Sequence, residues 1–281
     1  MKKIALLALF AAAVMNVNAT DLFVGSKHVS WDEGGIDIPA AQFAEAVAGQ
    51  KIVVSYNGAT DGIEFKLLEV WDHLAGSREA AWIGGNGIFE QFLTPAAVAG
   101  IQEYGLQIIG NNFTCTKVEL LDGKELKEGI TVWTGFFWAD EWSTLELYKE
   151  GYANVDFSKV EAIRFYSEAA SGEYILNFKE DWADWGHIAD QGAMTDGEGY
   201  KELALTDDLR SRLANAGHWM IQFNKEGLAP FNVTDVVLVP ANASAIDNTA
   251  LETKSTKIIR DGQVLILRDG KTFNALGVEI K

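Results

Sequence analysis

The sequence predicts an all-β protein made of two tandem antiparallel β-sandwiches, each with one short helix, followed by a small C-terminal hairpin. Three observations lead to this prediction. Short alternating apolar segments are separated by Gly, Asn and Asp turns, which is typical of antiparallel sandwiches. Five such segments recur in the same order along the chain. Only one brief helical pattern occurs in each copy.

The first 19 residues, 1–19, have the order of a secretory signal peptide. Lys2 and Lys3 precede an apolar run, and a short polar stretch ends at Ala19. The apolar run is too short to span a bilayer, so we exclude this segment from the fold and predict export. Elsewhere the chain has no apolar run of the length that a membrane-spanning helix needs. We therefore predict a secreted protein without membrane insertion.

The composition narrows the classes of partner. The formal net charge is −17, which makes nucleic acid and anionic lipid surfaces poor partners and leaves a neutral ligand or a cation as the candidates. Cys115 is the single cysteine, so no internal disulfide can form, and we expect a buried, inert thiol. The core alone must then stabilise the fold, which is feasible at 281 residues and favours two domains.

The two copies are predicted at residues 20–123 and 124–241. Trp31 and Trp71 have the same 40-residue spacing as Trp142 and Trp182. The alternating stretches "QKIVVSY" and "VEAIRFY" follow the first tryptophan of each pair and predict half-buried strands. The segments "FTCTKVEL" and "FNVTDVVL" match at a constant offset of 118. Such ordered matches indicate a duplication.

One helix is predicted in each copy, beginning at Thr94-Pro95 and at Thr206-Asp207. Threonine is a good N-cap, and proline or aspartate suits the first helical position. Beyond the copies, residues 242–256 are polar and lack periodicity, so they read as a linker. Residues 257–281 contain two short strands around Asp269-Gly270, the signal of a hairpin.

With these segments, each copy resembles a β-sandwich module found in secreted proteins of Bacteroidetes, often beside plant-polysaccharide hydrolases. The matching segments of the first copy are "AGQKIVVSY", the "W..L.G" pattern at Trp71 and "GLQIIGNNFTCTKVEL", with Phe23 where tryptophan is usual. The second copy diverges more, above all at residues 182–186, "WADWG". The tail, "DGQVLILRDGKTFNALGVEIK", resembles the C-terminal sorting signal of the type IX secretion pathway.

These resemblances imply sandwiches of the jelly-roll or galactose-binding type that bind carbohydrate without catalysis. They also imply retention at the outer cell surface, with residues 257–281 contacting the secretion or anchoring machinery. A polysaccharide of plant cell walls, of the β-glucan, cellulose or xylan type, is the implied partner. Two sites on one chain would gain avidity on such a repetitive polymer.

The nine tryptophans can be interpreted in two ways, as core residues or as ligand contacts. Tryptophan is usually buried, so each is a candidate for the core. A glycan site, however, needs flat apolar rings beside carboxylate and amide acceptors, and several of these tryptophans have acidic neighbours. Those at equivalent places in the two copies fit either reading, whereas Trp82, Trp138 and Trp185 have no counterpart and are better site candidates. The predicted ligand-binding residues are Trp31, Trp71, Trp82, Trp138, Trp142, Trp182, Trp185, Asp72 and Asp184.

Two rival functions remain open from the sequence. A glycan-cleaving enzyme needs two converging carboxylates, and Glu69 with Asp72, or Asp181 with Asp184, would be the pairs. Residues three apart on a strand point to opposite faces, so we expect solvated turn residues instead. The other rival is a surface adhesin or assembly protein that binds protein, which predicts buried aromatic rings and flat exposed patches.

No cofactor is predicted. The four histidines, at 28, 73, 187 and 218, lack the spacing of metal ligands, and acidic turns that could hold structural calcium lack a calcium-loop pattern.

Overall fold

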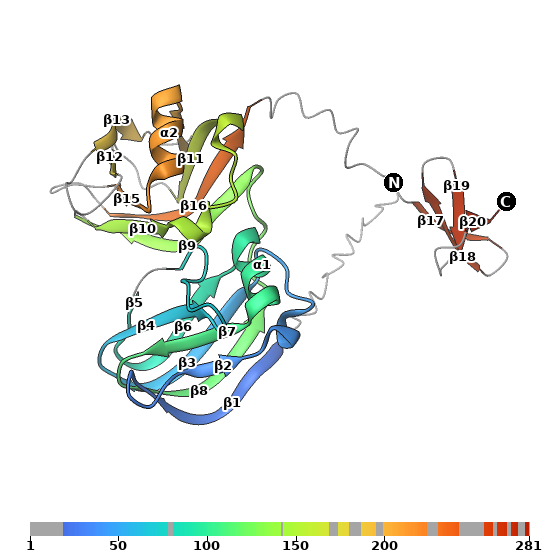
Figure 1. Cartoon of the computed structure of the whole chain (residues 1–281), viewed down its shortest axis with the longest axis horizontal. Helices are drawn as coiled ribbons and strands as arrows, with labels where there is room; N and C mark the ends of the chain where they lie inside the picture. The colour runs from blue at the N-terminus through green and yellow to red at the C-terminus, as the bar shows by residue number, and fades with distance from the viewer. Residues whose placement is uncertain are drawn as a thin grey trace, which may run out of the picture. The chain divides into compact units, whose positions relative to one another are not determined.

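The computed structural model describes residues 19–77, 81–141, 143–168, 174–179, 187–194, 199–223, 230–241, 256–260, 263–268, 271–274 and 279–280. The chain divides into two compact units, Met1–Pro240 and Ala241–Lys281 (Figure 1). The larger unit contains two β-sandwiches. The predicted signal peptide lies outside the described residues, apart from its last residue.

The first sandwich consists of two four-stranded sheets. One sheet has the strand order β1-β8-β3-β6 and the other has the order β2-β7-β4-β5. A 3-10 helix, η1 (Ala40–Phe43), and an α-helix, α1 (Pro95–Tyr104), connect strands. The strands are β1 (Thr20–Val29), β2 (Ile36–Ile38), β3 (Lys51–Ala59), β4 (Gly62–Leu67), β5 (Ala81–Trp82), β6 (Gly85–Phe92), β7 (Leu106–Gly110) and β8 (Phe113–Leu121).

The second sandwich repeats this topology. Its sheets have the orders β9-β16-β11-β14 and β10-β15-β12-β13, in which each strand takes the place of its counterpart in the first sandwich. Two 3-10 helices, η2 (Lys149–Gly151) and η3 (Phe157–Lys159), and the helix α2 (Asp207–Asn215) complete it. The strands are β9 (Ile130–Ala139), β10 (Thr144–Tyr148), β11 (Val160–Glu168), β12 (Tyr174–Lys179), β13 (His187–Met194), β14 (Tyr200–Ala204), β15 (His218–Gln222) and β16 (Phe231–Pro240).

Alternating side chains from both sheets of each sandwich build its core. In the first sandwich, Val54 of one sheet and Phe65 of the other belong to one buried cluster. In the second sandwich, Phe165 of β11 and Trp219 of β15 come from different sheets and belong to one buried cluster. Every strand pairing in the described residues is antiparallel. The predicted all-β sandwich class is therefore confirmed.

The two helices begin where the sequence predicts. The Thr94 hydroxyl accepts a hydrogen bond from the Ala97 backbone N–H at 3.1 Å, and Thr206 accepts one from Leu209 at 3.2 Å. Each threonine satisfies a backbone donor that the first helical turn leaves without an intrahelical partner. No helix of the described residues has the length and hydropathy of a membrane span.

Cys115 is fully buried between the sheets of the first sandwich. Burial raises the pKa of its thiol to about 11, and a hydrogen bond with the Lys117 backbone offsets part of this effect. Because the thiolate is the reactive species, we expect no alkylation of the folded protein by iodoacetamide at pH 8. Mass spectrometry should show full modification only after unfolding in urea, and fast labelling of the native protein would contradict the buried position.

The smaller unit is a four-stranded sheet with the order β17-β18-β19-β20. The predicted hairpin is its centre, because Arg268 of β18 (Gln263–Arg268) pairs with Lys271 of β19 (Lys271–Asn274). Two further strands, β17 (Thr256–Arg260) and β20 (Glu279–Ile280), flank this hairpin. Sequence reasoning missed β17 although Asp261-Gly262, before β18, is a turn signal of the same kind as Asp269-Gly270. It missed β20 because this strand has only two residues.

Candidate functional site

The structure separates the tryptophans of the described residues into two kinds. Two of them, Trp133 and Trp219, are buried in the second sandwich. Four others are at least half exposed: Trp31 at 52%, Trp71 at 50%, Trp82 at 72% and Trp138 at 54%. All four are predicted ligand-binding residues. The other predicted site residues Trp142, Trp182, Trp185 and Asp184 lie outside the described residues.

An exposed ring lacks the stabilisation that burial would give it, and two of these four rings lie in tight turns. Trp31 lies in the turn between β1 and β2, which is closed by the bond from the Gly34 N–H to the Ser30 carbonyl at 2.9 Å. Trp71 lies in the turn after β4, where its N–H donates to the Leu67 carbonyl at 2.8 Å. Its φ of 64° is in the left-handed region, which is strained for a bulky residue.

One of the two carboxylate pairs considered for catalysis belongs to the same turn, and the other, Asp181 with Asp184, lies outside the described residues. Glu69 and Asp72 are both exposed in this turn. Asp72 follows Trp71 directly, which puts a carboxylate next to an exposed ring, and its backbone carbonyl accepts the Leu67 N–H at 2.7 Å. Among the described residues, no group of three or more His, Cys, Asp and Glu side chains could hold a metal ion.

The second sandwich carries aromatic side chains on the outer face of the sheet β9-β16-β11-β14. Along β9, Phe137 and Ala139 point into the core, so Phe136 before them and Trp138 between them point outward. Across the sheet, Tyr166 of β11 pairs with Tyr200 of β14, and their ring centroids are 5.3 Å apart. We call the outward side chains of this sheet the aromatic sheet face.

Polar side chains lie in register with these rings. Trp138 is opposite Asn232 of β16, and Asn232 is opposite Glu168 of β11, so the three form one row across the sheet. The Asn232 amide donates to the Glu168 carboxylate at 3.3 Å. A ring, an amide and a carboxylate thus stand side by side on a surface that solvent reaches.

The corresponding sheet of the first sandwich presents a different surface. Lys117 forms ion pairs with Asp21 at 2.9 Å and with Glu119 at 2.6 Å. The exposed apolar side chains Val24 and Ile88 accompany them, and both are aliphatic. The two sandwiches therefore share strand order but not the chemistry of this face.

The connecting segment, residues 122–129, lies over one end of the aromatic sheet face. The Lys124 ammonium donates to the Thr234 carbonyl at 2.6 Å and to the Gly135 carbonyl at 3.2 Å. It also pairs with the carboxylate of Asp235 at 3.2 Å. Burial lowers the pKa of Lys124, and the Asp235 carboxylate offsets part of that decrease. This end of the sheet is therefore covered and fixed.

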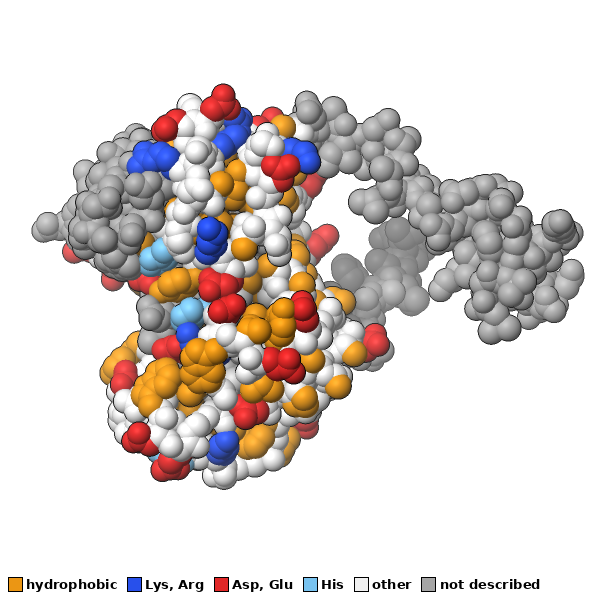
Figure 2. All heavy atoms as spheres, viewed as in Figure 1, with side chains coloured by type: hydrophobic (Ala, Val, Ile, Leu, Met, Phe, Trp, Pro, Cys, Tyr) orange, Lys and Arg blue, Asp and Glu red, His pale blue; other side chains and the backbone are white. Residues whose placement is uncertain are grey.

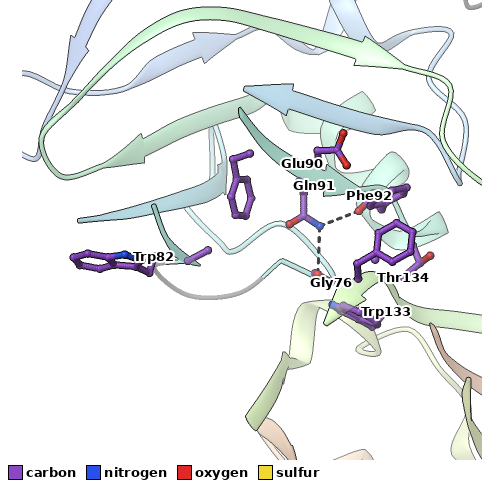
Figure 3. A pocket seen from close by; sticks show the side chains of 11 residues that line it. Gly76, Trp82, Glu90, Gln91, Phe92, Trp133 and Thr134 are labelled. Atoms are coloured by element: carbon purple, nitrogen blue, oxygen red, sulfur yellow. Dashed lines mark hydrogen bonds between the residues drawn. The ribbon is translucent and has the colours of Figure 1, made fainter. Parts of the chain in front are cut away.

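A cavity of about 470 Å³ lies between strand β6 of the first sandwich and strand β9 of the second (Figure 3). Figure 3 shows Trp82 at one end of the lining, Gln91 in the middle, and Phe92 and Trp133 at the other end. The Gln91 amide nitrogen donates to the Phe92 carbonyl at 2.9 Å and to the Gly76 carbonyl at 3.3 Å. The lining is Gly76, Ala81, Trp82, Phe89, Glu90, Gln91, Phe92, Trp133, Thr134, Gly135 and Phe136.

A second cavity, of about 440 Å³, lies on the aromatic sheet face beside the connecting segment. Its wall includes Tyr166, over whose ring the Lys127 ammonium lies at 5.4 Å from the centroid. Both volumes are within the range of roughly 300–1,000 Å³ that small-molecule sites occupy. The lining is Lys124, Glu125, Lys127, Phe136, Tyr166, Ser167, Glu168, Gly199, Thr234 and Asp235.

Sequence reasoning found Trp82, which lines the first cavity, and Trp138, which is exposed on the aromatic sheet face. It missed Phe136 and Tyr166, which line the cavities, and Tyr200, which pairs with Tyr166. The alternation of "WTGFFWA" does put Phe136 and Trp138 on one side of β9. The two tyrosines come from other strands, and only their pairing brings them to the same face.

Comparisons with known proteins find solved structures that resemble the chain at low sequence identity. No protein-family model matches it, and no curated protein matches it. It has 22% identity and a TM-score of 0.32 to SGBP-B of a Bacteroides ovatus mixed-linkage glucan utilization locus, solved with a mixed-linkage heptasaccharide. That match covers 36% of this chain and 29% of that protein, so the chain spans less than a third of it.

A second similar structure covers more of the chain at a lower score. It is a protein of Parabacteroides distasonis described as secreted, with 8% identity, a TM-score of 0.22, and coverage of 83% of this chain and 85% of that one. Neither likeness is close enough to transfer a function.

Proposed function

We propose that this protein binds a neutral cell-wall polysaccharide of the β-glucan, cellulose or xylan type and does not cleave it. The aromatic sheet face of the second sandwich is the proposed main contact. The observation that carries the proposal is the placement of Phe136 and Trp138, both more than half exposed, on the outer face of a sheet that also carries the amide of Asn232 and the carboxylate of Glu168.

The chemistry of a sugar ring explains why this combination suits a glycan. One face of the ring carries C–H groups, which pack on a flat aromatic side chain and lose contact with water. Hydroxyl groups at the rim need hydrogen-bond partners, which Asn232 and Glu168 supply in register with Trp138. Binding in this way needs no catalytic group.

Charge favours a neutral polymer over an acidic one. The chain has a net charge of −17, and acidic side chains are spread among hydrophobic ones on the face that Figure 2 shows. An anionic glycan would be repelled over distances up to about the Debye length, roughly 8 Å in physiological salt. A neutral chain of hydroxyl-rich rings meets no such repulsion.

The remaining predicted site residues belong to the proposal as secondary contacts. Trp31 and Trp71, the latter with its neighbour Asp72, are exposed on the first sandwich, as a glycan platform requires. Trp142, Trp182, Trp185 and Asp184 remain candidate contacts in the second copy. Export, retention at the outer surface and contact of residues 257–281 with secretion or anchoring machinery complete the proposed setting.

Trp138→Ala tests the main contact. We expect the variant to lose about tenfold or more in affinity for the polysaccharide that wild type retains best, because the ring face is removed. Its free energy of unfolding should change by less than about 0.5 kcal/mol, because the ring is exposed. Affinity electrophoresis on soluble β-glucan, cellulose derivatives and xylan gives the binding result, and urea unfolding gives the stability.

Ile88→Ala is the matched control, since Ile88 is exposed on the equivalent sheet of the first sandwich. It should bind like wild type. Retention of wild type on none of the polysaccharides would contradict the proposal and favour the protein-binding alternative. Release of reducing sugar from any of them would show an enzyme instead.

A further inference from the structure

We infer that the two cavities form one binding cleft that crosses from the first sandwich to the second, so that a single glycan chain contacts both. This inference rests on the proposed function, and it names the ligand more closely. The ligand is a linear, neutral oligosaccharide segment long enough to pass Phe136 and reach Trp82.

Phe136 is the residue at which the cavities meet. Its side chain lines both of them and is more than half exposed, so the ring stands between two hollows rather than inside a core. Trp82 borders the first cavity, and Tyr166 borders the second. Aromatic rings therefore occur in the middle and on both sides of the cleft, where successive sugar rings would need them.

Contacts across the junction hold the two sandwiches together at this point. The Phe92 ring of β6 meets the Phe136 ring of β9 edge to face, with centroids 5.7 Å apart. The Lys124 ammonium lies 5.6 Å from the centroid of Phe92 and 5.3 Å from that of Phe136. The Lys124 backbone N–H also donates to the Gly49 carbonyl of the first sandwich at 2.9 Å. The cleft is thus formed before a ligand arrives, which lowers the entropy cost of binding.

The polar groups of the cleft fit a neutral ligand with hydroxyl groups. Glu90 is paired with Lys51 at 2.5 Å, and Asp235 is paired with Lys124, so these charges are already compensated within the protein. Gln91 uses its amide nitrogen for two backbone carbonyls. Its amide oxygen is then the acceptor that remains for a sugar hydroxyl at the middle of the first cavity.

One cleft and two separate sites make different predictions about ligand length. A disaccharide can fill one cavity at most, whereas a hexasaccharide can extend from the aromatic sheet face past Phe136 to Trp82. Affinity in a single cleft should therefore rise with length until both cavities are filled. With two independent sites, every ligand that fills one cavity would bind with similar affinity per site.

The test is isothermal titration of the mature protein with gluco- and xylo-oligosaccharides of two and six residues. We expect wild type to bind the hexasaccharide of the preferred series at least tenfold more tightly than the disaccharide. Trp82→Ala should remove about tenfold of the hexasaccharide affinity, because the far platform is lost. The same variant should leave disaccharide binding at the aromatic sheet face unchanged, whereas Trp138→Ala should weaken both ligands.

Val24→Ala is the control. Val24 is 67% exposed on β1, at the opposite edge of its sheet from β6, and it lines neither cavity. This variant should leave the increase of affinity with ligand length intact. If Trp82→Ala binds the hexasaccharide like wild type while Trp138→Ala does not, the single cleft is excluded and the proposed function stands. If Trp82→Ala weakens both ligands equally, the single cleft is also excluded. If wild type binds neither these ligands nor the polysaccharides, the proposed function itself fails.

Discussion

Trp219→Ala is expected to lower the free energy of unfolding of the larger unit by about 3–5 kcal/mol, the usual cost of deleting a fully buried tryptophan. The side chain is 0% exposed. Its ring stacks on Tyr152 at 4.1 Å between centroids and meets the edge of Phe157 at 5.8 Å. Its indole N–H also donates to the carbonyl of Leu213 in α2 at 3.2 Å, so the deletion removes packing and leaves this buried acceptor unsatisfied.

Urea unfolding followed by circular dichroism measures this effect. Trp138→Ala is the matched control, because it deletes the same type of side chain from the outer face of the other sheet of this sandwich, where it is 54% exposed. The control should stay within about 0.5 kcal/mol of wild type. A change below about 1 kcal/mol for Trp219→Ala would show that the ring is not part of the core.

Lys124→Met is expected to lower the free energy of unfolding by about 3 kcal/mol, at the lower end of the cost of removing one partner from a buried ion pair. The Asp235 side chain is only 2% exposed and accepts a hydrogen bond from the Thr134 hydroxyl at 2.8 Å. Without Lys124, this carboxylate loses its ion-pair partner in a site with little water. The connecting segment also loses its bonds to the Gly135 and Thr234 carbonyls.

The double variant Lys124→Met with Asp235→Asn separates the charge effect from the packing effect. An asparagine keeps an acceptor for Thr134 but carries no charge, so the double variant should be more stable than Lys124→Met alone. Lys127→Ala is the control, because this lysine of the same segment is exposed and should change stability by less than about 0.5 kcal/mol. A double variant less stable than Lys124→Met would show that the buried charge is not the cause.

Local features of this fold could be predicted from the sequence because they depend on neighbours along the chain. The alternation in "QKIVVSY" and "VEAIRFY" corresponds to β3 and β11, and the threonine caps mark the first residues of α1 and α2. The strand β20, of two residues, carried no such signal and was missed. This strand can be recognised only by its pairing with β19, which is a feature of the tertiary structure.

The exposure of the tryptophans could not be predicted in the same way. Alternation along β9 requires Trp133 and Trp138, five residues apart, to point to opposite faces, but it does not say which face is the core. The pairing of β9 with β16 and the packing of the second sheet decide that Trp133 is inside. The sequence around Trp31 and Trp71 is compatible with core and with surface, and the turns that hold these residues leave both side chains at least half exposed.

The sequence by itself determined the all-β class, the duplicated pattern and the capped helices, because periodicity, spacing and turn chemistry are local or repeated along the chain. Only the tertiary structure decided which rings meet solvent and that Trp82, Phe136 and Tyr166 border adjoining cavities. The physical reason is that these residues lie far apart in the chain. Strand pairing and the junction between the sandwiches bring them together, and neither leaves a period in the sequence.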